Sequence, residues 1–84
     1  MDEIRKIIRG LVDLNKKYDI MFCSYNFNDV LIFDDIMIIS TLRILTKDYM
    51  LQKLRIYVDA IDINDYLMIK GKITRIYKIL DSLN

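Results

Sequence analysis

The chain contains no histidine, and that absence limits the chemistry open to its 84 residues. Histidine is the usual general base near neutral pH, a common zinc ligand and the usual partner of a nucleophilic serine or cysteine. Most hydrolase mechanisms therefore lack their proton-transfer group here. Only two glycines are present, and no glycine-rich phosphate loop can be found. We predict that the protein is not an enzyme and takes no small-molecule substrate.

Cysteine is almost absent as well. The single Cys23 excludes an internal disulfide and leaves no second thiol for a metal site, which fits a reducing compartment. Its apolar neighbours predict a small core residue rather than a nucleophile. The carboxylate-rich segment 59–65 lacks the glycine and the closing glutamate of a calcium loop, and the adjacent Asp34 and Asp35 would point to opposite faces of a strand. Both segments are interpreted as turns, so we expect no metal and no cofactor.

The sequence also lacks long apolar runs and an excess of charge of one sign. No stretch approaches the roughly 18 to 20 uncharged apolar residues of a membrane span, and the first residues, with Asp2 and Glu3, do not resemble a signal peptide. We expect no membrane span and a cytoplasmic location. Thirteen Lys and Arg against twelve Asp and Glu leave a net charge of +1, which gives no global field to attract nucleic acid.

What the chain has in abundance is apolar side chains, at 54% of its residues. A domain of this length has little interior in which to bury them, so some apolar surface is expected to meet a partner. The length leaves room for a single domain spanning residues 1–84. The predicted partners are further copies of the chain or another protein, with nucleic acid as the less favoured alternative.

The clearest predicted element is a helix over residues 1–18. Apolar side chains recur there at helical spacing, with charges on the other side; they are Ile4, Ile7, Ile8, Leu11 and Leu14. Asp2 is the expected N-cap. Gly10 is expected to mark a close approach to another backbone.

Residues 19–80 are predicted to form a β-sheet region, because β-branched and aromatic residues recur in short runs between Asn- and Asp-rich clusters. The expected strands lie near 19–25, 30–33, 36–45, 49–59 and 66–78. The fourth run alternates between an apolar and a polar face, as a half-buried strand does. The predicted fold class is therefore α+β, with an N-terminal amphipathic helix followed by a small antiparallel sheet or partly open barrel of about five strands. Residues 73–83 also fit a helical stripe, so a short C-terminal helix stays open as the alternative ending.

The predicted interaction surface combines basic and aromatic side chains near the end of the chain. It comprises Arg55, Tyr57, Lys70, Lys72, Arg75, Tyr77 and Lys78. Sheets that bind single-stranded nucleic acid combine such residues, but a row of Lys and Arg on the wet face of a strand ordinarily protects an edge. We therefore favour a protein-binding surface over a nucleic-acid site.

Two segments resemble a known family. Val30 to Asp35 and Asp62 to Tyr77, with Gly71 inside the second, are similar in their order of apolar residues to the YabP and YqfC family of sporulation proteins. That resemblance implies a small β-rich domain without catalytic residues, used in assembly of the spore envelope. The segment 47–48 departs from the family, which often has a glycine there.

Two alternatives stay open. Residues 33–37 and 69–71 also resemble the two motifs of Sm-like RNA-binding small barrels, although Ile38 stands where that family carries a base-contacting Asn. A small protein without catalytic residues could instead come from a phage or mobile element and inhibit a host enzyme by binding it. The leading hypothesis is a non-catalytic interaction or assembly module.

Overall fold

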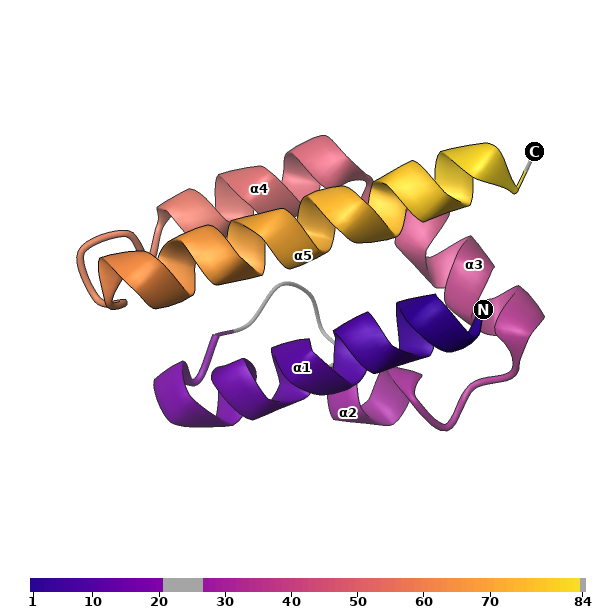
Figure 1. Ribbon diagram of the computed structural model, residues 1–84, viewed down its shortest axis with the longest axis horizontal. Helices are drawn as coiled ribbons and strands as arrows, with labels where there is room; N and C mark the ends of the chain where they lie inside the picture. Colours follow the sequence, from indigo (N-terminus) through magenta and orange to yellow (C-terminus); the bar gives the residue numbers. More distant parts are fainter. Residues whose placement is uncertain (21–26, 84) are drawn as a thin grey trace.

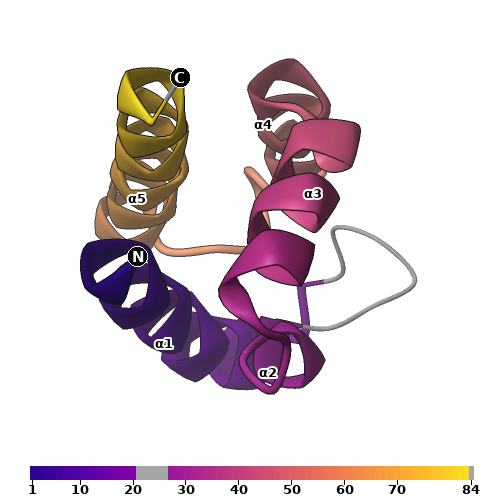
Figure 2. The same cartoon turned by 90° about the vertical axis from the view of Figure 1, so that its right-hand side faces the viewer.

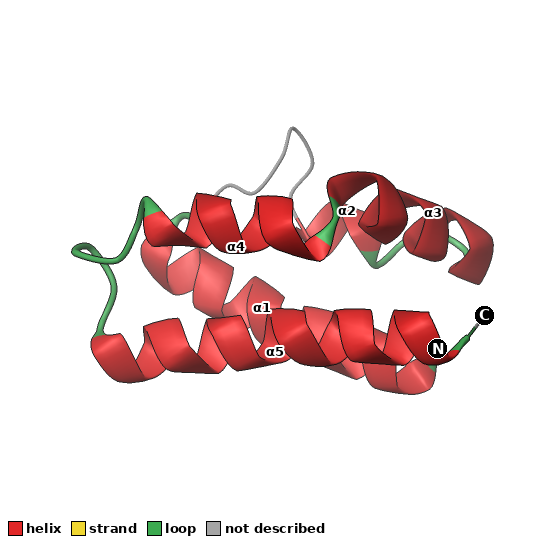
Figure 3. Ribbon diagram, turned by 90° about the horizontal axis from the view of Figure 1, so that it is seen from above, coloured by secondary structure: helices red, strands yellow, loops and turns green. Residues whose placement is uncertain are grey.

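The computed structural model describes residues 1–20 and 27–83, and all regular secondary structure in these two ranges is helical (Figure 3). The helices are α1 (Asp2–Tyr18), α2 (Phe27–Val30), α3 (Asp35–Leu45), α4 (Lys47–Arg55) and α5 (Ile63–Ser82). The expected N-terminal helix is present as α1. The predicted α+β class is wrong, because no strand of the antiparallel sheet or barrel forms in the part of the chain described.

The ends of α1 follow from local chemistry. Asp2 and Glu3 lie in the first turn and Lys16 and Lys17 in the last, where each sign of charge complements the helix dipole. Asp2 is inside the helix and not its N-cap, which is Met1. The helix stops because Asp19 takes a left-handed conformation with φ of 53°, and its N–H donates to the Asn15 carbonyl at 2.7 Å.

Three short polar side chains begin the later helices. The Asp34 carboxylate accepts a hydrogen bond from the Met37 amide at 2.9 Å, and the Thr46 hydroxyl accepts one from the amide of Tyr49 at 3.2 Å. Asp62 caps α5 by accepting from the amide of Asn64. The Asp-rich positions interpreted as turns between strands are thus turns that lead into helices.

Helix α5 is the centre of the arrangement. It contacts α1 on one side and α4 on the other, while α2 packs against α1. Figures 1 and 2 show that α1 and α4 both run opposite to α5, with α3 leading into α4 at the end of the molecule where the C-terminus lies. The antiparallel pairing brings the start of α1 near the end of α5.

The core among the described residues is apolar and contains no charged side chain. It is built from every helix, from Ile20 after α1 and from Ile61 in the connection before α5. Its members are Ile4, Ile8, Leu11, Val12, Ile20, Phe27, Val30, Ile38, Leu42, Met50, Leu54, Ile61, Ile69, Ile73, Ile76, Tyr77 and Leu80.

The strand predictions failed because short, Ile-rich runs satisfy both periodicities. In the expected strand 49–59, Leu54 is fully buried, but Ile56 and Val58 are 72% and 43% exposed, so they do not share its buried face. The buried pair in that segment is Met50 and Leu54, one helical turn apart.

The other expected strands are corrected in the same way. Segment 36–45 lies in α3, 66–78 lies in α5, and 30–33 is the end of α2 and the turn after it. Expected strand 19–25 falls largely outside the described residues, as does Cys23. The alternative of a C-terminal helix over 73–83 is the correct one, and that helix already begins at Ile63.

Candidate protein-binding surface

The seven residues predicted as an interaction surface do not form one surface. Tyr77 is only 8% exposed, and its hydroxyl donates to the Leu42 carbonyl at 2.6 Å and lies 3.2 Å from the Met50 sulfur. Its ring therefore belongs to the core, between α5 and the α3–α4 region. Tyr57 is half-buried and packs against the same core.

Two of the predicted cations lie against α1. Arg75 donates two hydrogen bonds to the Glu3 carboxylate, at 2.8 and 3.0 Å. Lys72 extends alongside Gly10, since a Cβ built on that glycine would lie 2.9 Å from the Lys72 ammonium. The close approach expected at Gly10 is thus to a side chain and not to a backbone. Lys78 is exposed on α5.

Arg55 and Lys70 are the two predicted residues that the fold brings together. They line a hollow of about 330 Å³ between α4 and α5, along with Leu51, Gln52 and Tyr66. Arg55 ends α4, whereas Tyr66 and Lys70 lie one turn apart near the start of α5. The antiparallel packing of these two helices therefore places a cation from each helix at one hollow.

A second hollow adjoins the first along α4. It is lined by Tyr49, Gln52, Lys53 and Ile56, which follow one another at helical spacing, and Gln52 borders both hollows. We call the combined lining the α4–α5 surface. Its members are Tyr49, Leu51, Gln52, Lys53, Arg55, Ile56, Tyr66 and Lys70.

The α4–α5 surface carries charge of one sign. Lys53, Arg55 and Lys70 are cationic, and the lining of the two hollows includes no Asp or Glu. Among residues 1–20 and 27–83, none of these three cations forms an ion pair. Lys53 instead lies over the Tyr49 ring, 5.5 Å from its centroid, a favourable cation–π geometry that covers one ring face.

Aliphatic side chains are exposed beside this surface and on α3. Ile56 belongs to the surface, and Leu67, which follows Tyr66 and lies one turn before Lys70 on α5, is exposed. On α3, Ile36 and Ile44 are exposed and lie about 80° apart around the helix axis. The predicted basic and aromatic set did not include any of these aliphatic residues.

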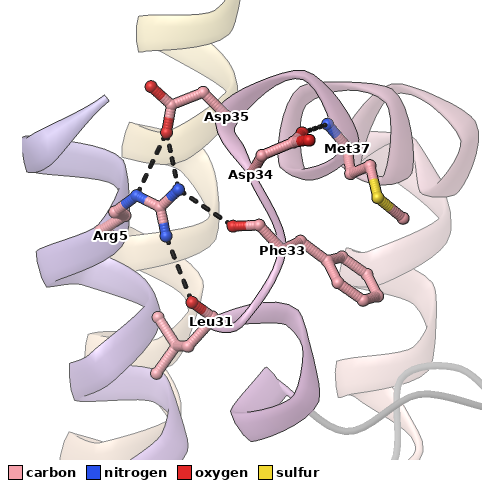
Figure 4. Close-up of polar contacts among 6 residues, drawn as sticks. All are labelled: Arg5, Leu31, Phe33, Asp34, Asp35 and Met37. Carbon is pink, nitrogen blue, oxygen red and sulfur yellow. Dashed lines mark hydrogen bonds and ion pairs between the residues drawn. The ribbon is translucent and has the colours of Figure 1, made fainter.

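Arg5 is a positioning residue that sequence reasoning missed. Its guanidinium donates to the carbonyls of Leu31 and Phe33 at 3.2 and 3.0 Å and to one Asp35 carboxylate oxygen at 2.6 and 3.2 Å (Figure 4). It thereby ties α1 to the α2–α3 connection. Arg5 and Asp35 also line a hollow there, together with Asp34 and Ile36. The only sequence signal was an arginine beside the apolar stripe of an amphipathic helix.

A second polar cluster joins the end of α1 to the start of α5. The hydroxyl of Tyr18 donates to the Asp65 carboxylate, and the Lys17 ammonium bonds the same oxygen at 3.0 Å. The hydrogen bond from Tyr18, followed by that from Lys17, lowers the pKa of Asp65. The bond to Asp65 raises the pKa of Lys17.

No group of three or more Cys, Asp or Glu side chains within residues 1–20 and 27–83 is arranged to hold a metal ion. None of the helices described combines the length and apolarity needed to cross a bilayer.

No family model, no curated protein and no solved structure matches this chain significantly. The two segments that carry the resemblance to the sporulation family are helical or helix-connecting here, and so are those that carry the Sm-like resemblance.

Proposed function

We propose that the protein is a non-catalytic protein–protein interaction module. The observation that carries the proposal is the exposure of large aliphatic side chains on well-formed helices. Ile36 and Ile44 are 76% and 81% exposed on α3, and Ile56 is exposed at the end of α4. Exposed aliphatic side chains of this size support a binding role, because their burial against a partner is favourable by about 25 cal/mol per Å².

The chemistry of the remaining side chains supports a binding role over a catalytic one. Histidine is missing from the whole sequence. The polar clusters around Arg5 and Asp65 hold helices together, since each links α1 to a distant part of the chain. Their functional groups are engaged in structural bonds, which leaves the apolar and cationic surfaces for partners.

The first test is the mass of the purified protein by light scattering across a wide concentration range. We expect the protein to self-associate reversibly. The double variant Ile36→Ser/Ile44→Ser should associate more weakly, because this variant lacks two exposed aliphatic side chains of α3. Leu83→Ser is the matched control, since Leu83 is also exposed but lies after the end of α5. Addition of a generic single-stranded RNA should leave the mass unchanged.

A protein that stays monomeric at every concentration and binds no amphipathic peptide would contradict the proposal. A ring that changes mass with RNA would contradict it too. The β-rich domain that the sporulation resemblance implies does not form in the described residues, and only the setting that it implies, assembly of a spore envelope, stays a prediction. Inhibition of a host enzyme also stays a prediction, and it would be detected as a stable complex with a single protein. The Sm-like barrel is not proposed further, because it requires strands where the described residues are helical.

A further inference from the structure

We propose that the α4–α5 surface binds an acidic amphipathic helix of a partner protein. This inference rests on the proposed function and names the class of partner. One hollow of the surface lies between α4 and α5, with Leu51 and Tyr66 in its lining, and the adjoining hollow lies along α4 alone, with Ile56 in its lining. A hollow between two packed helices that continues along one of them is a groove in which an amphipathic helix can lay its apolar face.

Charge complementarity selects an acidic partner. Lys53, Arg55 and Lys70 border the hollows without a carboxylate in the lining, and no ion pair to the described residues neutralises them. The chain as a whole carries only +1, so Arg55 and Lys70, which share one hollow, are a local concentration of positive charge. Glutamate or aspartate flanking the apolar stripe of a bound helix would pair with these cations, which fixes orientation and raises the association rate.

The same surface is poorly suited to nucleic acid. Single-stranded binders present open aromatic faces on which bases stack, but one face of the Tyr49 ring is covered by Lys53 and Tyr66 is half-buried. Three cations would also release few counterions, and counterion release supplies most of the sequence-independent affinity for nucleic acid. The exposed aliphatic side chains Ile56 and Leu67 are better matched to the apolar stripe of a helix.

The probe is a fluorescein-labelled amphipathic helical peptide with leucines on one face and glutamates flanking them. Its control replaces every glutamate by lysine, and a second control is labelled single-stranded oligouridine. Binding is measured by fluorescence anisotropy at low and physiological salt. We expect the acidic peptide to bind, with an affinity that falls as salt rises, and neither control to compete with it.

Charge-reversal variants locate the site. Arg55→Glu and Lys70→Glu should each weaken binding of the acidic peptide by roughly fivefold or more at low salt, since each replaces attraction by repulsion. Lys6→Glu is the matched control, because Lys6 is exposed on α1 and its reversal changes the net charge equally. The neutral variants Arg55→Gln and Lys70→Gln remove each cation without adding a carboxylate. Circular dichroism of all five variants shows whether any loss of binding comes from a lost contact or from a lost fold. Lys70→Glu should gain affinity for the lysine peptide.

Three results would overturn the inference. One is equal binding of the acidic and lysine peptides. Another is an affinity that Lys6→Glu lowers as much as Lys70→Glu does, and the third is oligouridine binding that the acidic peptide cannot displace. If any of these occurs while the protein still self-associates by light scattering, this inference fails and the interaction module stands. If self-association and all peptide binding are both absent, the proposed function fails with it.

Discussion

Among single residues, the two glycines differ in what a side chain would meet. Gly71 lies inside α5, and a Cβ added there would contact nothing within 4 Å. Gly10 lies inside α1, where the added Cβ would come within 2.9 Å of the Lys72 ammonium, the far end of a flexible side chain. Glycine is about 1 kcal/mol less favourable than alanine in a helix interior, so each glycine lowers the stability of its helix and can be replaced.

We therefore predict that Gly71→Ala raises the free energy of unfolding by about 1 kcal/mol. Gly10→Ala should stabilise by somewhat less, because the end of Lys72 must move aside. Urea denaturation followed by circular dichroism measures both. A loss of stability in Gly71→Ala would show that this position has a neighbour that the described structure does not contain.

At the scale of elements, Arg5 decides how α1 meets the α2–α3 connection. The Arg5 side chain is only 21% exposed, and it donates to two backbone carbonyls of the α2–α3 connection. The carboxylate of Asp35 is largely exposed, so its ion pair with Arg5 contributes little. The carbonyl contacts are the larger part of the effect, because they are partly buried hydrogen bonds from a charged donor, which contribute more than an exposed ion pair.

Arg5→Lys should lower the free energy of unfolding by about 1 to 3 kcal/mol, because an ammonium cannot reach both carbonyls and the carboxylate at once. It should also speed amide hydrogen exchange over residues 31–38. The matched control is Arg9→Lys, one turn further along α1, where the arginine is exposed and forms no ion pair with the described residues. Equal stability and exchange in the two variants would contradict a positioning role for Arg5.

On the scale of the whole molecule, polar contacts hold the two ends of the α1–α5 pair. Glu3 bonds Arg75 at one end, and Lys17 with Tyr18 bonds Asp65 at the other. This placement follows from the antiparallel packing, and it couples the first and last helices of the chain. The second cluster should make stability depend on pH.

The carboxyl of Asp65 has a lowered pKa in the folded state because Tyr18 and Lys17 hydrogen-bond its charged form. Its contribution to stability is therefore present above the unfolded pKa of about 3.9 and is lost as the pH falls through the lower folded value. The stability advantage of the wild type over Asp65→Asn should be constant between about pH 5 and 7 and shrink below about pH 4. Urea melts at pH 7, 5, 4 and 3 measure it, and an undiminished gap at pH 3 would refute the assignment.

Sequence reasoning predicted some of this molecule and missed most of its elements. The helix α1 was predictable because its apolar residues repeat only at helical spacing, with charges elsewhere. In α5, Ile69, Ile73, Ile76 and Leu80 also repeat at helical spacing, but the β-branched and aromatic residues of the segment favoured a strand. Intrinsic propensity is a weak preference that packing overrides, and α5 is stabilised by contacts with both α1 and α4.

The candidate surface, like the helices, was predicted only in part. Arg55 and Lys70 were predicted as basic residues of one surface, and the fold does place them together, but on two packed helices rather than on strands. Lys72, Arg75 and Tyr77 were grouped with them because they are basic or aromatic residues of the same short stretch. A helix turns about 100° per residue, so it sends Tyr77 into the core and Arg75 toward Glu3.

The sequence by itself determined that the protein is a small, histidine-free chain with nearly balanced charge. It also determined the N-terminal amphipathic helix and the presence of more apolar side chains than the interior can hold. Those properties depend on residue identity or on spacing within one segment. Only the tertiary structure decided that the Ile-rich runs are helices, that Arg5 binds a segment 26 to 30 residues away, and which cations share a surface. These outcomes depend on which faces of distant segments pack together, and the pattern within a single short segment does not contain that information.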